Sequence, residues 1–266
     1  MAGTLGILSI HGIGEQDEHY ADDFLKRLKA LLPADIRRET RLKPIYYQDI
    51  MKGNQERNWA KYAATELRAR LLRKKLLYYG GDAVSYRYRP EDANSIYAAV
   101  HERIKKGIDT IYTDMNNPNA RLVIVAHSFG GQAISNHIWD AQHDNGIWKK
   151  RMPTGSGELS NLILLITTGC NIPLFVSAVE DPIAIEPVND DFFQWYNLYD
   201  KNDVLGWPLR MLSDSYSTTV TADLAVNTGL WVGSHGKYWR RRKVIKLIAR
   251  LITSAYRKQD EATQTT

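Results

Sequence analysis

The chain has 266 residues, enough for one large α/β domain or two small ones. With 44% hydrophobic and 24% charged residues, and no apolar run near the length of a membrane span, the composition excludes a disordered or membrane-spanning chain. The single cysteine, Cys170, excludes an internal disulfide and a cysteine-based metal cluster. A formal net charge of +5 is too small to indicate a nucleic-acid partner by itself.

The N-terminal sequence predicts a strand, a turn and a helix. Residues 4–10 form a short apolar run that ends in the glycine-rich turn HGIG, and residues 15–32 repeat apolar positions at helical spacing. No basic region precedes the apolar run, which indicates a first strand and not a signal peptide. We therefore expect a cytoplasmic protein, or one exported without a cleaved signal.

The next segment predicts a second strand at 41–50, a long basic helix over 56–79 and a further helix over 95–115. The basic stretches 66–79 and 238–246 are typical of solvated helix faces, and a binding patch is the alternative. Because helix 56–79 also carries leucines and tyrosines, a membrane surface is a candidate partner for it. No nucleic-acid-binding motif accompanies these stretches, and we expect no nucleic-acid partner.

The second half of the chain alternates strands and helices, which predicts a mostly parallel sheet covered on both faces, a three-layer α/β/α sandwich. We expect a single domain over 1–257, with possible cap elements within 50–95 and 204–232 and a flexible tail at 258–266. The predicted strands lie at 121–126, 161–168 and 192–199, and the predicted helices at 130–143 and 241–256.

Ser128 stands where the strand at 121–126 turns into the following helix. A serine there can be a simple helix N-cap, whose hydroxyl accepts a bond from the first helical turn. A cap needs no small neighbours, however, whereas Ser128 has Ala126 before it and Gly130 and Gly131 after it. Small residues at these points are what a strained strand-to-helix turn requires, because the two backbones approach closely.

The segment A-H-S-F-G-G therefore resembles the nucleophile elbow G-x-S-x-G of the α/β-hydrolase superfamily, with Ala126 in place of the first glycine. In particular it is similar to small bacterial lipases and esterases that carry an A-H-S-x-G-G elbow. The resemblance implies the α/β-hydrolase fold, with Ser128 as the nucleophile. It covers nearly the whole chain as an order of motifs, from HGIG to SHGKYW.

The same resemblance implies an oxyanion hole. An acyl hydrolase needs preorganised N–H donors, and in these families one comes from the residue after an early HG dipeptide and the other from the residue after the nucleophile. The corresponding donors here are the backbone amides of Ile13 and Phe129. A dinucleotide-binding fingerprint, the other interpretation of GIG, would need a glycine where the chain has Asp17.

The acid and the base are expected later in the chain, in the order Ser, Asp, His. Asp203 and Asp200 both follow the strand at 192–199, where either can also form an Asx-turn; we favour Asp203, because the resembled hydrolases usually follow the acid with a small apolar residue such as Val204. His235, in a glycine-containing loop before the last helix, is the predicted base.

These observations predict a serine hydrolase that cleaves small-molecule or lipid carboxylic esters through an acyl-enzyme and needs no cofactor and no metal. Two alternatives stay open. One is a lipase or phospholipase that acts at a membrane surface through helix 56–79. The other is a non-catalytic binding module on the same fold, since a fold does not determine a function.

Overall fold

The computed structural model describes residues 3–13, 16–51, 86, 88–149, 159–188, 192–229 and 233–264. Its centre is a sheet of six strands that all run parallel, in the order β2-β1-β3-β4-β5-β6. The strands are β1 (Leu5–Ile10), β2 (Thr40–Ile45), β3 (Arg121–His127), β4 (Leu162–Thr168), β5 (Gln194–Asp200) and β6 (Ala222–Val226).

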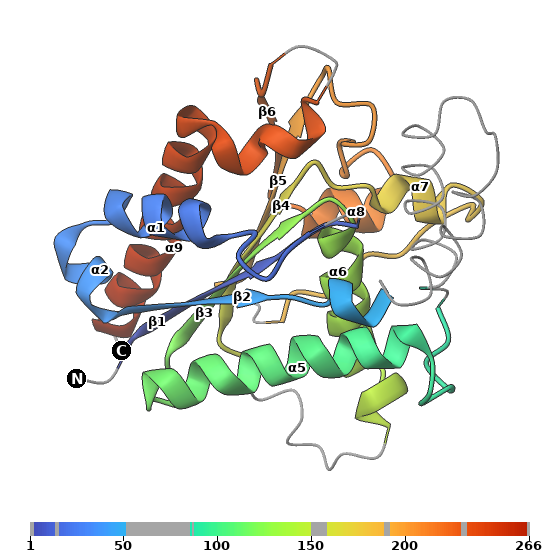
Figure 1. Cartoon of the computed structure of the whole chain (residues 1–266), viewed down its shortest axis with the longest axis horizontal. Coiled ribbons are helices and arrows are strands. Elements are labelled where there is room, and N and C mark those ends of the chain that lie inside the picture. The colour runs from blue at the N-terminus through green and yellow to red at the C-terminus, as the bar shows by residue number, and fades with distance from the viewer. Residues whose placement is uncertain are drawn as a thin grey trace, which may run out of the picture.

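Helices cover both faces of this sheet (Figure 1), so the expected three-layer sandwich is confirmed. On one face α1 packs beside α9, and on the other α5 lies along β1 and β2 while α6 lies along β3. The helices are α1 (Asp22–Leu31), α2 (Ala34–Glu39), α5 (Ile96–Met115), α6 (Phe129–Gln142), α7 (Ile172–Val176), α8 (Asp214–Thr219) and α9 (Arg242–Gln264), with 3-10 turns η1 (Gly146–Trp148) and η3 (His235–Arg240).

The central strands are apolar throughout because both of their faces are buried. In β3, Leu122 and Ile124 belong to the core under α5 and α6, whereas Val123 and Val125 belong to the core under α1 and α9. Side chains alternate between the two faces of a strand, so a continuous apolar run supplies both cores at once.

The structure differs from the expected elements mainly toward the C-terminus. The segment 204–232, expected as a loop or cap, contains α8 and the edge strand β6 among its described residues. Helix α9 continues to Gln264, eight residues past its expected end at Tyr256. The predicted helix 56–79 and most of the candidate cap 50–95 lie outside the described residues.

The strand order places a crevice between β1 and β3. From β1 the chain proceeds outward to β2 on one side, and from β3 it proceeds through β4, β5 and β6 on the other. Ligands of open parallel sheets bind at such a switch point, beyond the carboxyl ends of the strands. Here these ends carry His11 and Gly12 after β1, and Ser128 after β3.

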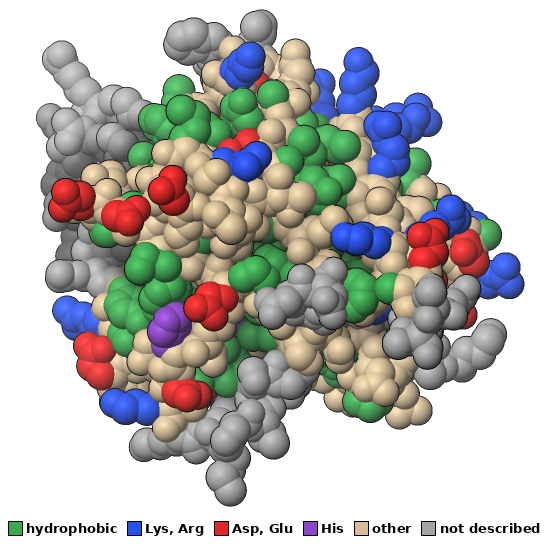
Figure 2. Space-filling view, turned by 180° about the vertical axis from the view of Figure 1, so that it is seen from behind, with side chains coloured by type: hydrophobic (Ala, Val, Ile, Leu, Met, Phe, Trp, Pro, Cys, Tyr) green, Lys and Arg blue, Asp and Glu red, His purple; other side chains and the backbone are tan. Residues whose placement is uncertain are grey.

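The basic side chains of the stretch 238–246 are exposed at the end of η3 and the start of α9. Arg242, Lys243 and Lys246 lie in water, while Val244 and Ile245 are buried between α9 and the sheet. Basic side chains gather on this side of the molecule when it is seen from behind (Figure 2). No helix in the described ranges combines the length and the apolar character needed to traverse a bilayer.

Candidate active site

Ser128 occupies a strained turn between β3 and α6. Its φ of 55° and ψ of −125° lie in a region that a residue with a side chain rarely adopts. Although Ser128 is the first residue before the helix, its hydroxyl makes no capping bond to α6. The turn therefore holds the hydroxyl outside the helix, where it is free to meet groups from other segments.

Glycines allow the backbones around this turn to approach closely. A Cβ on Gly130 would lie 2.6 Å from the carbonyl oxygen of His11, and one on Gly131 would lie 2.7 Å from Sγ of Cys170. A Cβ on Gly12 would lie 2.7 Å from Cβ of Ser128. A larger residue at Gly12 or Gly130 would push the loop after β1 away from the serine, and one at Gly131 would collide with Cys170 after β4.

His235 links Ser128 to Asp203. Its Nε2 lies 2.7 Å from Oγ of Ser128, and its Nδ1 lies 2.8 Å from Oδ2 of Asp203. A carboxylate only accepts hydrogen bonds, so Nδ1 carries the proton and Nε2 accepts the serine hydroxyl proton. Three residues that are far apart in the sequence are thus joined by one hydrogen-bonded chain, with the serine at its open end.

Asp203 is held as a carboxylate in spite of its burial. Burial raises the pKa of Asp203, but hydrogen bonds from His235, the Leu205 amide and Tyr238, together with the charge of His235, outweigh that effect and leave it below the ordinary value. The Tyr238 hydroxyl donates to Oδ2 at 2.9 Å and accepts from the Asp200 amide at 2.8 Å.

Tyr238 was missed by the sequence reasoning, although one signal was present. It lies three residues after His235, so in a helical turn both side chains fall on the same side. It is fully buried, and its ring lies close to the position of Gly169, where a Cβ would be 2.8 Å away. The residue therefore positions the carboxylate without facing the serine.

Asp200, the alternative acid, points to a different group of partners. Its Oδ2 accepts from the hydroxyl and the amide of Thr228, and its Oδ1 accepts from the Asn202 amide at 2.9 Å. The Thr228 hydroxyl also lies 2.9 Å from the carbonyl oxygen of Ser234, the residue before His235. Asp200 thus fastens the loop that carries the histidine, whereas Asp203 contacts the histidine ring.

Two further histidines flank the site and are held neutral. Burial lowers the pKa of His11 to about 4, and its ring bonds the Gly12 carbonyl and the Tyr47 amide. Burial, followed by the charge of His235, lowers the pKa of His127 to about 3. His127 donates from Nδ1 to the Thr168 carbonyl at 2.9 Å. Both side chains therefore fix loops and carry no charge at neutral pH.

The two amides expected to form an oxyanion hole belong to residues next to Ser128 or next to a residue that contacts it. Phe129 is the residue after the serine and starts α6, while Ile13 follows Gly12, which abuts the serine side chain. Both residues are buried. The amide of Phe129 belongs to the first helical turn, where no intrahelical acceptor exists. Gly14, the last residue of the HGIG turn, is outside the described residues.

No protein-family model matches the chain, and no curated protein sequence matches it. Similar solved structures include dienelactone hydrolase from Anabaena variabilis, with 9% identity, a TM-score of 0.48 and coverage of 96% of this chain and 87% of that one. A soluble variant of monoglyceride lipase from Saccharomyces cerevisiae has 10% identity, a TM-score of 0.46 and coverage of 95% and 86%. A hormone-sensitive lipase from a metagenome library has 12% identity, a TM-score of 0.44 and coverage of 96% and 79%. Likeness at this level carries no argument about activity.

The fold itself is recognisable from the arrangement of this chain. Ser128 in its strained turn follows β3, Asp203 follows β5 and His235 follows β6, on a parallel sheet with helices on both faces. This is the α/β-hydrolase fold, in which the nucleophile turn, the acid and the histidine occur in that chain order.

Proposed function

We propose that this protein is a serine hydrolase that cleaves carboxylic esters through an acyl-enzyme. The observation that carries the proposal is the continuous chain from Oγ of Ser128 through His235 to Asp203, with contacts of 2.7 and 2.8 Å. A nucleophile within hydrogen-bonding distance of a base, which is itself oriented by a third group, is the arrangement that activates a serine.

In the first half of the reaction, Oγ of Ser128 attacks the ester carbonyl while Nε2 of His235 takes the hydroxyl proton. The carbonyl oxygen becomes an oxyanion, which accepts hydrogen bonds from the Ile13 and Phe129 amides. Asp203 stays ionised and stabilises the imidazolium that forms. The tetrahedral intermediate then collapses, the bond to the alcohol oxygen breaks, and His235 returns the proton to the departing alcohol.

In the second half, water takes the place of the alcohol. His235 removes a proton from the water, the hydroxide oxygen attacks the acyl carbonyl, and collapse of the second intermediate releases the acid and restores the Ser128 hydroxyl. Every proton is carried by His235, so the cycle balances with protein groups and water alone and calls for no cofactor.

The test is hydrolysis of p-nitrophenyl acetate by wild type and by Ser128→Ala. The variant is expected to fold normally and to lose several orders of magnitude in kcat, because a serine triad acts as a unit. Ser254→Ala, on the exposed side of α9, is the matched control and should keep full activity. Wild-type hydrolysis by Ser128→Ala would refute the nucleophile.

A fluorophosphonate probe separates the enzyme from a binding module on the same fold. Labelling requires an activated serine, so wild type and Ser254→Ala should react and Ser128→Ala should not. Folded wild-type protein that neither takes up the probe nor hydrolyses esters would favour the binding module.

A further inference from the structure

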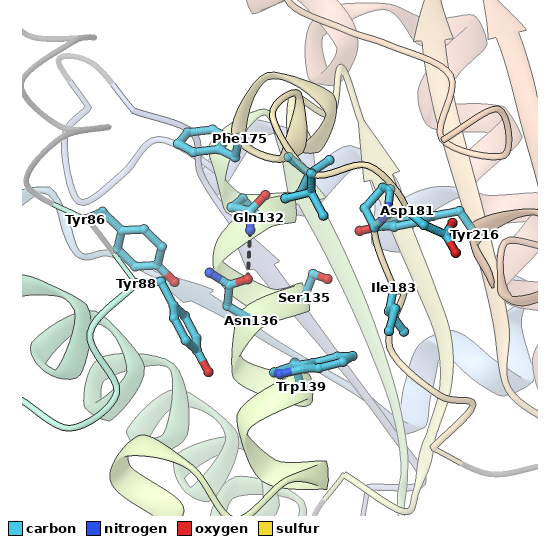
Figure 3. Close-up of a pocket in the computed structure, with 13 residues that line it drawn as sticks. Tyr86, Tyr88, Gln132, Ser135, Asn136, Trp139, Phe175, Asp181, Ile183 and Tyr216 are labelled. Atoms are coloured by element: carbon cyan, nitrogen blue, oxygen red, sulfur yellow. Dashed lines mark hydrogen bonds between the residues drawn. The ribbon is translucent and has the colours of Figure 1, made fainter. Parts of the chain in front are cut away.

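A cavity of about 720 Å³ runs along α6, beyond Ser128 (Figure 3). One wall is a polar face of the helix, where Gln132, Ser135 and Asn136 recur at helical spacing and Trp139 follows one turn later. The opposite wall is mostly apolar and comes from the segment 175–183, which starts at the end of α7. The cavity therefore has one hydrogen-bonding side and one apolar side.

The cavity begins close to the proposed nucleophile. At 1.5 Å of rise per residue, Gln132 lies roughly 6 Å along the helix from Ser128 and Trp139 roughly 16 Å. The ring of Phe129, whose amide is a proposed oxyanion donor, packs on two residues of the cavity wall. Its centroid lies 4.7 Å from that of Tyr86 and 5.5 Å from that of Phe175. The cavity wall thus packs against the residue that directly follows the proposed nucleophile.

In this cavity Gln132 presents a buried hydrogen-bond acceptor that has no donor partner among the described residues. Its side-chain nitrogen donates to Oδ1 of Asn136 at 2.7 Å, which orients the amide. Its oxygen is buried and receives no hydrogen bond within the described part of the chain, and the residue as a whole is only 8% exposed. Leaving such an acceptor unpaired costs about 1–3 kcal/mol, so a ligand that brings a donor gains from this position.

The charges and aromatic rings around the cavity restrict the chemical class of the ligand further. Among the lining residues that the structure describes, Asp181 is charged and none is cationic. An anionic group would face this carboxylate and the Gln132 oxygen together, which is repulsive. The side chains of Trp139, Tyr88 and Phe175 offer ring surfaces for an apolar or aromatic body.

We propose that this cavity binds a neutral, hydroxyl-bearing substituent of the ester, with its hydroxyl donating to Oε1 of Gln132 and its aromatic or apolar body against Trp139 and Phe175. The inference rests on the proposed function, because it assigns one part of the same substrate. The hydroxyl belongs either to the acyl chain or to the alcohol, and the two arms of the experiment distinguish these sources.

The first arm uses p-nitrophenyl esters of a phenylalkanoic acid with and without a hydroxyl on the third carbon of the acyl chain. The second uses acetate esters of a phenylalkanol with and without a hydroxyl at the same position of the alcohol. In one arm, wild type is expected to hydrolyse the hydroxylated ester with a kcat/KM about 2- to 12-fold higher, the effect of one hydrogen bond. Gln132→Met, which keeps the length of the side chain but removes the acceptor, should abolish that preference.

Two variants control the comparison. Gln132→Glu keeps an oxygen acceptor and should retain the preference, while Gln142→Met makes the same change farther along α6, outside this cavity, and should leave it intact. Equal kcat/KM values for each pair in wild type, or a preference that survives in Gln132→Met, would overturn the inference.

The outcome also separates this inference from the proposed function. If both esters acylate Ser128 but no hydroxyl preference occurs in either arm, the cavity assignment fails and the serine hydrolase stands. If no ester acylates Ser128, both fail. The expected result combines acylation of Ser128 with a preference that depends on Gln132.

Discussion

The protein contains two Asp–His pairs in different parts of the fold, and their surroundings make them chemically different. In the pair after β5 and β6, Asp203 contacts His235 at 2.8 Å, and the imidazole side chain is 14% exposed beside Ser128. In the pair between α5 and α6, Asp140 lies 3.8 Å from His101, and both side chains are buried. The second imidazole faces the Tyr86 hydroxyl instead of a serine.

The pKa values of the two aspartates are also shifted in opposite directions. The pKa of Asp203 is lowered because its hydrogen bonds outweigh burial, whereas burial raises the pKa of Asp140 despite hydrogen bonds from Tyr97 and Tyr88. Burial, followed by the charge of His137, lowers the pKa of His101 well below the ordinary value. We infer from the comparison that an Asp–His pair is suited to catalysis where hydrogen-bond donors keep the carboxylate ionised and the imidazole contacts a nucleophile.

The largest expected difference between the pairs is in activity. Asp203→Asn should lower kcat on p-nitrophenyl acetate by about 10⁴-fold, because an amide favours the wrong imidazole tautomer. Asp140→Asn should stay within about threefold of wild type, and Asp200→Asn should slow turnover far less than Asp203→Asn. If Asp200→Asn were the slower of the two, the acid would have to be reassigned to Asp200.

The buried pair of Asp140 and His101 should matter for stability and not for activity. Asp140→Ala leaves the hydroxyl of Tyr97, which lies 2.7 Å from the carboxylate, without its acceptor in the core. The free energy of unfolding is expected to fall by roughly 2–4 kcal/mol, as measured by urea denaturation. Tyr88→Phe removes a more exposed bond to the same carboxylate, 3.2 Å long, and serves as the milder control. Equal losses in both variants would contradict this account.

The buried histidine should also make stability depend on pH. Because the pKa of His101 is lower in the folded state than in the unfolded chain, its contribution is complete above about pH 6.5 and declines as the pH falls below it. The decline amounts to at most about 1.4 kcal/mol per pH unit for one such group.

Urea unfolding at pH 7.5 and pH 5 measures this slope. His101→Gln should have a shallower slope than wild type, though not a flat one, because His11 also has a lowered pKa of about 4. An identical slope in the variant and the wild type would show that His101 is not held neutral by the fold.

The smallest expected effect concerns Tyr238, which we regard as a positioning residue. Tyr238→Phe removes one donor to Asp203, so the pKa of this carboxyl should rise toward its ordinary value. We expect kcat to fall about 3- to 10-fold with little change in KM, and the loss of rate at low pH to begin at a higher pH. A variant with reduced kcat but an unmoved acid limb would indicate a purely structural role.

The sequence predicted the centre of the fold well because the central strands are buried on both faces. Continuous apolar runs such as those of β3 and β4 are strong signals, and they were located within a residue or two. Strand β6 was missed because it is a five-residue edge strand with mostly half-exposed side chains. Such a strand is stabilised by pairing with β5, which a local pattern does not reveal.

The site residues were named from a motif and from chain order, but their surroundings were not foreseen. The elbow pattern around Ser128 carries its own geometric signal, since small residues mark the close approach of backbones. The support of Asp203 by Tyr238 spans 35 residues of the chain, and the bond from Thr228 to Asp200 that braces the histidine loop spans 28. These contacts follow from tertiary packing, which spacing along the chain does not specify.

The most direct test of the central claim is mass spectrometry of the protein quenched in acid during turnover of p-nitrophenyl acetate. An ester bond to the nucleophile survives acid, so wild type should gain the mass of one acetyl group, and the modified peptide should contain Ser128. Asp203→Asn should accumulate the adduct more slowly, and Asp140→Asn should match wild type. Turnover without any adduct, or an adduct on another residue, would contradict the account.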